Sequence, residues 1–257
     1  MKISVCIITL NEEHNLSRCL RSVMSIADEI IILDSGSLDR TKEIAQSFGT
    51  QFFEQPWQGY VKQKNAAIAL ARHDWVFSID ADEELSEPLR ESILHMKLSR
   101  QEPSHDAFAV SRIVYFLGKW IRFGDWYPDY VVRLFRKKKS RFAGGAVHER
   151  LETDGSVGRL KGELYHYTYK DYEDQCKRIE KYSTLWAGSA YQEGKRCSKW
   201  APYVHAGWKF FRGFIIKRGW QGGKLGWQIS KSTAREVFLK YSKLYAMQEA
   251  ARSYDKS

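Results

Sequence analysis

The 257-residue sequence lacks the features that would place it across a membrane or in an oxidising compartment. Its first ten residues hold an apolar stretch too short for a signal-peptide core, and no small-residue cleavage site follows. No uncharged apolar run approaches the ~18 residues of a transmembrane helix. The four cysteines, Cys6, Cys19, Cys176 and Cys197, show neither CxxC spacing nor nearby histidine pairs. We therefore expect reduced thiols in a cytosolic protein.

Two common nucleotide-binding motifs are also missing. The first apolar run is not followed by G-x-G-x-x-G, and G-x-x-x-x-G-K-[ST] occurs nowhere, which excludes the usual dinucleotide and NTPase phosphate cradles. A nucleotide bound by this chain would need a metal ion and basic side chains, such as Lys62 and Lys64, for its phosphates.

What the sequence does have is an uneven distribution of charge. Hydrophobic residues make up 43% and aromatic residues 14%, which excludes a disordered chain, and the net charge is +10. Residues 193–257 hold 14 Lys and Arg against 4 Asp and Glu, so they carry the whole excess and residues 1–192 are neutral. Any function must account for a neutral body with a basic, Trp-rich tail.

Strands and helices alternate through the first hundred residues. We expect strands at 4–10, 29–33, 50–54 and 75–79, and helices at 15–27, before Gly49 and at 59–71. Further strands are expected at 107–115 and 131–135, and helices at 173–186, 203–216 and 232–251. This order predicts a Rossmann-like α/β fold, in which helices cover both faces of a mostly parallel sheet, followed by a helical, basic-aromatic extension.

Polar residues cluster where three of these strands end. Asn11-Glu12 follows the first strand, Asp34-Ser35-Gly36-Ser37 the second and Asp80-Ala81-Asp82-Glu83 the fourth. Ligands of open α/β sheets bind beyond the carboxyl ends of the strands, so this coincidence indicates a binding site.

Two of these segments allow a functional and a structural interpretation. Asp80 and Asp82 would repel each other at a strand end unless a hard cation such as Mg²⁺ or Mn²⁺ bridged them to a diphosphate. Alternatively, they form a solvated turn in which Asp82 or Glu83 caps a helix. The Asp34 carboxylate could accept from a base or a ribose, or it could cap its own turn.

Four segments in order, SVCIITLNEE, IILDSGSLDRT, QGYVKQKNAAI and WVFSIDADEEL, resemble family 2 glycosyltransferases with the GT-A fold. VVRLFR and VHERL resemble the acceptor side of that family, and the pattern is most similar to short bacterial enzymes that add glucose to the lipopolysaccharide inner core. Many members have a second Asp after the nucleoside-binding one. This chain has Ser35 there, which leaves the base open.

The resemblance implies a nucleotide-sugar site and a metal site at the sheet edge. It places Thr9, Asn11 and Glu12 around the nucleoside, Asp34 with Ser35 and Gly36 at a uracil, Lys64 and Asn65 near base and phosphates, Asp80 with Ala81 near the ribose, and Asp82, with Asp80 possible, on Mg²⁺ or Mn²⁺.

The implied reaction is an inverting displacement that needs a carboxylate base on the acceptor side. The candidates are Asp125, Asp129, Glu149 and Glu152. We favour Glu149, because Gly144-Gly145 allows close backbone approach, although pairing with Arg150 at the surface is equally compatible. His148 and His166 are expected to be core histidines rather than metal ligands.

Acceptor contacts are expected from aromatic and basic residues after position 120. Trp126 and Tyr127 suit a sugar shelf, and Arg133 and Arg136, with the lysines at 137–139, suit acceptor phosphates. Aromatic packing and a solvated basic loop are the alternatives.

The tail combines apolar and basic side chains at helical spacing. Val204, Trp208, Phe211 and Ile215 share one helix face, flanked by lysines and arginines. This is typical of a helix in the headgroup layer of an anionic membrane. Packing on the body is the alternative, and the acidic strand ends argue against nucleic acid.

Taken together, these observations predict three segments and one activity. Residues 1–100 would bind the nucleotide sugar, 101–168 the acceptor, and 169–257 a membrane. The expected protein transfers a sugar, with UDP-glucose as donor, to a lipid-linked glycan such as the heptose of the lipopolysaccharide inner core. It would lie at the cytoplasmic face of the bacterial inner membrane. Another lipid-linked or polyprenyl acceptor, and a nucleic-acid-binding protein, are the alternatives; the oligomeric state stays open.

Overall fold

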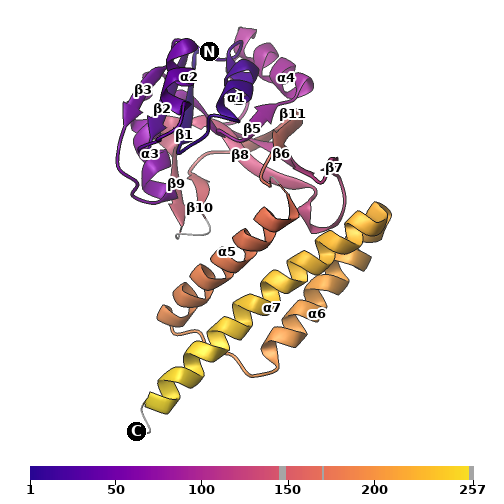
Figure 1. Cartoon of the computed structure of the whole chain (residues 1–257). Coiled ribbons are helices and arrows are strands. Elements are labelled where there is room, and N and C mark those ends of the chain that lie inside the picture. The colour runs from indigo at the N-terminus through magenta and orange to yellow at the C-terminus, as the bar shows by residue number, and fades with distance from the viewer. Residues whose placement is uncertain (145–148, 170, 255–257) are drawn as a thin grey trace. The chain divides into compact units, whose positions relative to one another are not determined.

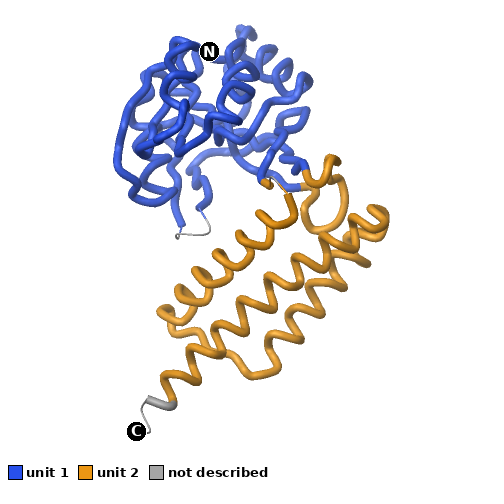
Figure 2. The backbone as a smooth tube through the Cα atoms, in the orientation of Figure 1, with its two compact units in different colours: residues 1–115, 129–168 blue, residues 116–128, 169–257 orange. Residues whose placement is uncertain are grey.

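The computed structural model describes residues 1–144, 149–169 and 171–254, which form two compact units (Figure 2). Unit 1 comprises Met1–Tyr115 and Asp129–Thr168, and unit 2 comprises Phe116–Pro128 and the chain from Tyr169 onward. Residues 116–128, which the sequence analysis groups with the acceptor segment, therefore belong to the unit that contains the C-terminal helices.

Unit 1 is built on one mixed sheet with the strand order β3-β2-β1-β4-β8-β6-β11-β5 (Figure 1). The strands are β1 Ile3–Thr9, β2 Glu29–Asp34, β3 Gln51–Glu54, β4 Trp75–Asp80, β5 Glu83–Leu85, β6 Ala107–Phe116, β8 Asp129–Arg136 and β11 Val157–His166. A separate hairpin consists of β9 Ser140–Gly144 and β10 Glu149–Thr153. The helices are α1 Leu16–Val23, α2 Thr41–Ser47, α3 Tyr60–Leu70 and α4 Glu87–Leu98.

The first half of the sheet is parallel, as the alternation of strands and helices predicts. β1 pairs in parallel with β2 and β4, and β2 with β3. In the second half β8 is antiparallel to both β4 and β6, and β5 is antiparallel to β11. The α/β fold class is confirmed.

Alternating residues of β1 divide the core into two layers. Ile3, Val5 and Ile7 pack with the apolar sides of α1, α2 and α4, whereas Cys6 packs with α3 on the opposite face. Helices thus cover both faces, which leaves the carboxyl ends of the parallel strands as the accessible edge.

Several elements were not predicted. Helix α4 begins after Ser86, whose hydroxyl accepts from the Leu89 main-chain N–H. Asp82 and Glu83 do not cap this helix, which corrects one of the two alternatives given for them, because the short strand β5 lies between. Strand β11 passes so close to α4 that a Cβ on Gly162 would lie 2.2 Å from the Leu89 nitrogen.

Unit 2 is mainly helical. It contains β7 Lys119–Ile121, a 3₁₀ turn at Gly124–Trp126, α5 Tyr172–Gln192, α6 Ala201–Phe211 with a π-helical continuation at Arg212–Ile216, a 3₁₀ turn at Gly219–Gly222 and α7 Gly223–Tyr254. The last helix starts earlier than the predicted 232, because Gly226 does not break it. A Cβ on Gly226 would lie 1.8 Å from the Gly219 carbonyl oxygen, so glycine permits a close backbone contact there.

Among the described residues, no helix is both long and apolar enough to cross a bilayer. The four cysteines are free thiols, and Cys6 and Cys19 are buried. Burial raises the pKa of the Cys6 thiol to about 12.

Glu29 links the parallel strands at their amino ends, on the side of the sheet opposite the carboxyl ends where the polar residues cluster. Its buried carboxylate accepts from the Ser4 hydroxyl, the Arg72 main-chain N–H and guanidinium, and the Gln51 amide. Burial alone would raise the pKa of Glu29, but these hydrogen bonds lower it to about 2. Because the folded-state pKa lies below the unfolded value, the stabilisation is complete above pH 4.5 and is lost as pH falls toward 2.

We predict that Glu29→Gln destabilises unit 1 at pH 7 by up to about 3 kcal/mol, the equivalent of the shift from 4.5 to about 2. Urea unfolding at pH 7 and pH 3 measures the effect, which should shrink at the lower pH. Glu43→Gln, which removes an exposed partner of Arg40, is the control and should cost less than about 1 kcal/mol. Equal losses in the two variants would contradict the assignment.

Candidate active site

Parallel pairing aligns the three strand ends that the sequence analysis singled out. Thr9 of β1 lies opposite Asp34 of β2, and Ile8 of β1 lies opposite Asp80 of β4. The structure therefore brings together the residues predicted for the nucleotide sugar, Thr9, Asn11, Glu12, Asp34, Ser35, Gly36, Lys64, Asn65, Asp80 and Ala81, at one edge of unit 1.

Asp34 organises the turn after β2. One of its oxygens accepts from the main-chain N–H groups of Gly36 and Ser37, and the other accepts from the hydroxyls of Ser37 and Thr9. Four hydrogen bonds use the acceptor positions of this buried carboxylate. The geometry favours the turn-capping interpretation, and direct contact between Asp34 and a base stays a prediction.

The loops after β1 and β2 are fastened to each other. Asn11, at a φ of 56°, donates its main-chain N–H to Ser37 Oγ and accepts from the Leu38 N–H. Glu12 donates its main-chain N–H to Thr41 Oγ1 and accepts at its carboxylate from Asn15. These contacts fix one wall of the predicted nucleoside pocket.

Ser35 is held from the α3 side by a residue that sequence reasoning missed. Gln63 is fully buried, and its amide donates to Ser35 Oγ at 3.1 Å and to the Gln55 carbonyl at 3.2 Å. The available signal was its position beside Lys64: a residue next to a predicted site residue on the same helix also lies close to the site.

Asp80 lies between two buried cations. Its two oxygens are 2.8 Å from Lys64 Nζ and 2.8 Å from an Arg133 guanidinium nitrogen. Burial alone would raise the pKa of Asp80, but Lys64 and Arg133 hold it well below its usual range. Asp80 is therefore ionised, and Lys64 is a fixed positive charge at the sheet edge.

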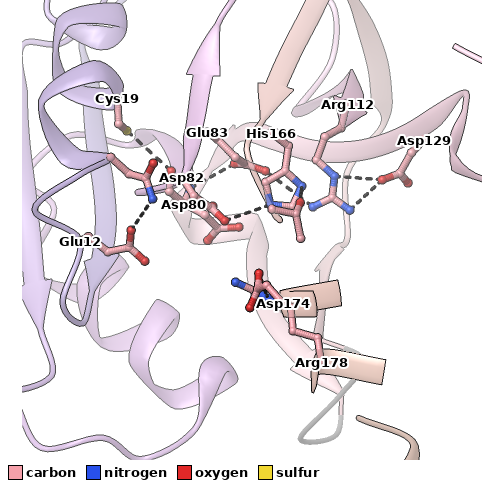
Figure 3. A network of polar contacts seen from close by, with 12 residues as sticks. Glu12, Cys19, Asp80, Asp82, Glu83, Arg112, Asp129, His166, Asp174 and Arg178 are labelled. Carbon is pink, nitrogen blue, oxygen red and sulfur yellow. Dashed lines mark hydrogen bonds and ion pairs between the residues drawn. The ribbon is translucent and has the colours of Figure 1, made fainter. Parts of the chain in front are cut away.

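Glu83 is a further residue of this network that the sequence analysis did not assign. Its fully buried carboxylate accepts from the Asp80 main-chain N–H and from Arg133, and it lies 3.6 Å from Arg112 (Figure 3). Arg112 in turn donates twice to Asp129. The available signal in the sequence was that Glu83 is a third acidic residue within four positions, directly after a buried strand.

Asp82 faces His166. Antiparallel pairing of β5 with β11 sets His166 opposite Glu83, and the His166 Nε2 atom lies 3.3 Å from an Asp82 oxygen (Figure 3). The other ring nitrogen is 2.7 Å from Thr168 Oγ1, and the Tyr167 main-chain N–H donates to the Asp82 carbonyl. His166 is largely buried, as expected, but its ring is directed at the predicted metal residue.

The charges of the cluster match a divalent cation. Among the described residues of this network, five carboxylates (Asp80, Asp82, Glu83, Asp129 and Glu149) stand against three cations (Lys64, Arg112 and Arg133), an excess of two negative charges. No group of three or more His, Cys, Asp or Glu side chains suited to a metal occurs in the described parts of the chain. A carboxylate and an imidazole would thus leave most coordination positions to water and phosphate oxygens, which is usual for Mg²⁺ and Mn²⁺.

Glu149 reaches the same cluster from the hairpin. Lys64 Nζ lies 3.4 Å from the Glu149 carboxylate as well as 2.8 Å from Asp80. Arg150 pairs instead with Glu152, so the surface pairing considered for Glu149 is not formed. Gly145 and His148, which also entered the prediction, lie outside the described residues.

Asn65 holds this hairpin in place rather than pointing at a ligand. Its amide donates to the Phe142 carbonyl at 2.8 Å and accepts from the Phe142 N–H at 2.9 Å. A side chain thus satisfies the backbone of β9 as a neighbouring strand would. This contact positions the hairpin strand that carries Glu149.

The two remaining base candidates each pair with an arginine. Asp129 is paired with Arg112, and Asp125, in unit 2, lies 2.9 Å from Lys209 and 2.6 Å from Arg212.

The predicted acceptor residues are dispersed. Trp126 and Tyr127 belong to unit 2, where Trp126 stacks on Tyr169. Arg133 is buried between Asp80 and Glu83. The prediction for Arg136 needs correction: antiparallel pairing sets it opposite Trp75, at the far end of β4 from Asp80, and it pairs there with Asp74 and Glu102.

A comparison with protein families decides the identity of this fold and site. The family model described as glycosyl transferase family 2 matches residues 4–152, more than half of the chain. The chain belongs to glycosyl transferase family 2. The resemblance noted in the sequence is confirmed, and this glycosyltransferase has the GT-A fold.

Curated relatives align with nearly the whole chain. The lipopolysaccharide core biosynthesis glycosyltransferase LpsC of Rhizobium meliloti is 32% identical over 95% of this chain and 92% of the relative. An uncharacterised glycosyltransferase of Rickettsia typhi is 32% identical over 98% of this chain and 89% of its own length.

Solved structures are more distant. Staphylococcus aureus TarS 1–349 in complex with UDP-GlcNAc has a TM-score of 0.49 and 13% identity, covering 98% of this chain and 92% of the TarS 1–349 chain. Glucosyl-3-phosphoglycerate synthase from Mycobacterium tuberculosis, solved with Mn²⁺ and UDP-glucose, has a TM-score of 0.34 and 23% identity, covering 46% and 44%.

We predict that Asn65→Ala loosens the hairpin without unfolding the glycosyltransferase. Losing two hydrogen bonds should speed amide hydrogen exchange of Phe142 at least tenfold, about 1.4 kcal/mol. Exchange measured by NMR or mass spectrometry tests this. Ala69→Ser, on the exposed face of the same helix, is the control. Unchanged exchange at Phe142 in Asn65→Ala would refute the positioning role.

Proposed function

We propose that this glycosyltransferase is metal-dependent and inverting, and that it moves glucose from UDP-glucose to a lipid-linked bacterial glycan of the lipopolysaccharide inner-core type. Membership of family 2 supports transfer from a nucleotide sugar. The lipopolysaccharide assignment is supported by LpsC, which is similar over nearly the full length of both chains.

The observation that carries the proposal is the position of Lys64. Its ammonium group joins Asp80, on the predicted donor side, to Glu149, the predicted base. The Asp82–His166 pair lies two residues beyond Asp80 at the same sheet edge. One cluster therefore offers a fixed cation, a pair of metal ligands and a carboxylate base.

Asp82 would hold the divalent metal together with His166, which replaces the expectation that His166 is a core residue rather than a metal ligand. When bound, Mg²⁺ or Mn²⁺ supplies Lewis-acid stabilisation of the diphosphate leaving group. Thr168, hydrogen-bonded to the other His166 nitrogen, fixes the orientation of the ring. Arg133 and Glu83 hold Asp80 in its ionised, ordered position.

The protein groups then act on the acceptor and the leaving group. Glu149 accepts the proton of the acceptor hydroxyl, whose oxygen bonds to the anomeric carbon from the face opposite the diphosphate. The bond between that carbon and the diphosphate oxygen breaks, and the electron pair leaves with UDP. Lys64, already fixed within the cluster, stabilises the charge that develops on the diphosphate.

The nucleobase of the donor and the acceptor of the sugar are specified less directly. Ser35, held by Gln63, occupies the position where many relatives have a second Asp. It would contribute to the choice of nucleobase. Another lipid-linked or polyprenyl acceptor is the alternative to the heptose. A nucleic-acid-binding role is displaced by membership of an enzyme family.

We predict that Asp82→Ala and His166→Ala each weaken Mn²⁺-dependent binding of UDP at least tenfold, because each removes a metal ligand. Isothermal titration of UDP with Mn²⁺ and with EDTA measures the effect. Asp154→Asn, which removes an exposed carboxylate of unit 1, is the charge-matched control. Full Mn²⁺-dependent binding by both alanine variants would rule out the metal assignment.

Glu149→Gln should lower kcat for transfer by about 10²- to 10⁴-fold, the usual contribution of a general base. Its affinity for UDP-glucose should stay within about threefold of wild type. Steady-state transfer assays and donor titration separate the two effects. If Glu152→Gln abolished transfer while Glu149→Gln did not, the base would have to be reassigned.

A further inference from the structure

Unit 2 presents an apolar helix face to solvent. Trp200, Val204, Trp208, Phe211 and Ile215, spaced three or four residues apart along α6 and its continuation, are 47–66% exposed. Exposed apolar patches of this kind mark interaction surfaces.

Two cavities lie beside this face, among the residues of α5, α6 and α7. Their volumes are about 490 Å³ and about 330 Å³, and Trp186, His205 and Tyr241 line both. We call the two together the α5–α7 groove. The exposed side chain of Trp208 lines the second cavity, so the groove adjoins the apolar face of α6.

The shared wall of the groove is flat and aromatic. The His205 ring stacks on Tyr241 with 4.1 Å between centroids and 5° between planes, and Trp186 lies 5.3 Å from Tyr241. Such a wall offers packing area to hydrocarbon or glycerol C–H groups.

The rim of the groove is cationic. Lys195 and Arg196 line the first cavity, and Lys209, Arg212 and Lys240 line the second. Within the described part of the chain, the residues that line the two cavities include no carboxylate.

Part of this rim charge is neutralised by neighbouring carboxylates. Glu193 pairs with Lys195, Asp125 with Lys209 and Arg212, and Glu236 with Lys240. Five cations against three carboxylates leave two positive charges in excess. Arg196 donates to the carbonyls of Tyr191 and Lys195, so its guanidinium is held at the mouth by neutral groups.

We propose that the α5–α7 groove binds the phosphate-bearing headgroup of an anionic phospholipid while the apolar face of α6 enters the interfacial layer beside it. Arg196 and Lys195 meet the phosphate, and the aromatic wall packs on the glycerol region. The inference extends the membrane partner expected from the tail's composition to a defined binding site. It does not depend on which sugar the enzyme transfers.

The variant Lys195→Gln/Arg196→Gln tests the groove. Since each cation near an anionic surface contributes roughly 1 kcal/mol, we expect this double variant to bind vesicles containing phosphatidylglycerol about 10- to 30-fold more weakly. The matched control is Lys177→Gln/Lys181→Gln, which removes two charges from the exposed face of α5 and should weaken binding less than threefold. Equal losses in the two variants would mean diffuse electrostatics and would overturn the proposal.

A short-chain phosphatidylglycerol below its micellar concentration gives a second readout. We expect saturable 1:1 binding to the wild type, detected by titration, and at least tenfold weaker binding to Lys195→Gln/Arg196→Gln. Inorganic phosphate that bound as tightly as the lipid, or short-chain phosphatidylcholine that did so, would overturn the phospholipid assignment.

Transfer to a water-soluble acceptor separates this inference from the proposed function. The groove variant should retain wild-type activity on such an acceptor, while vesicle binding falls. If the groove variant lost transfer to the water-soluble acceptor as well as vesicle binding, a separate lipid site would be contradicted. Failure of the wild type to transfer any sugar would refute the proposed function and leave the lipid measurements valid.

Discussion

The site in unit 1 depends on one buried ammonium group. Lys64 is 5% exposed and lies between Asp80, at the end of β4, and Glu149, on the hairpin. Removing one partner from such a buried arrangement leaves an uncompensated charge, which costs several kcal/mol. The ion pairs therefore connect the sheet edge to the hairpin. The two hydrogen bonds between Asn65 and the Phe142 main chain keep the Glu149 carboxylate close to Lys64. In the proposed function, donor binding and the position of the base both depend on this contact.

Around this contact the carboxylates have different roles because their surroundings differ. The Asp34 carboxylate accepts hydrogen bonds from the main chain of its own turn. The Glu83 carboxylate is buried and accepts from Arg133 and the Asp80 N–H. Asp82 instead faces the His166 imidazole. The two negative charges in excess make this edge suited to a divalent cation and its diphosphate, whereas unit 2 concentrates positive charge and exposed aromatic residues. Acidic residues thus gather at the sheet edge of unit 1, and basic residues in unit 2.

The parallel half of the fold and the alignment of its strand-end residues could be predicted because the relevant signals are local. Runs such as Glu29–Asp34 are buried throughout, and parallel pairing necessarily aligns Thr9, Asp34 and Asp80. The rest depends on distant pairing. Strand β11 contains Gly158, Lys161 and Gly162, so it does not read as a strand, yet its pairing with β5 sets His166 beside Asp82. Arg136 was misplaced for the same reason, since only the antiparallel register of β8 shows which end of β4 it reaches. The start of α7 was placed too late because the close backbone contact that requires glycine at Gly226, inside this helix, cannot be read from the sequence.

The central claim is that Lys64 couples the donor side to the base. A double-mutant cycle with Lys64→Met and Glu149→Gln, read out as kcat/KM for sugar transfer, tests it most directly. We predict that the two substitutions are non-additive, with the double variant at least fivefold more active than the product of the single effects, about 1 kcal/mol of coupling. Effects that multiply without coupling would contradict a shared role and would assign Lys64 and Glu149 to independent functions.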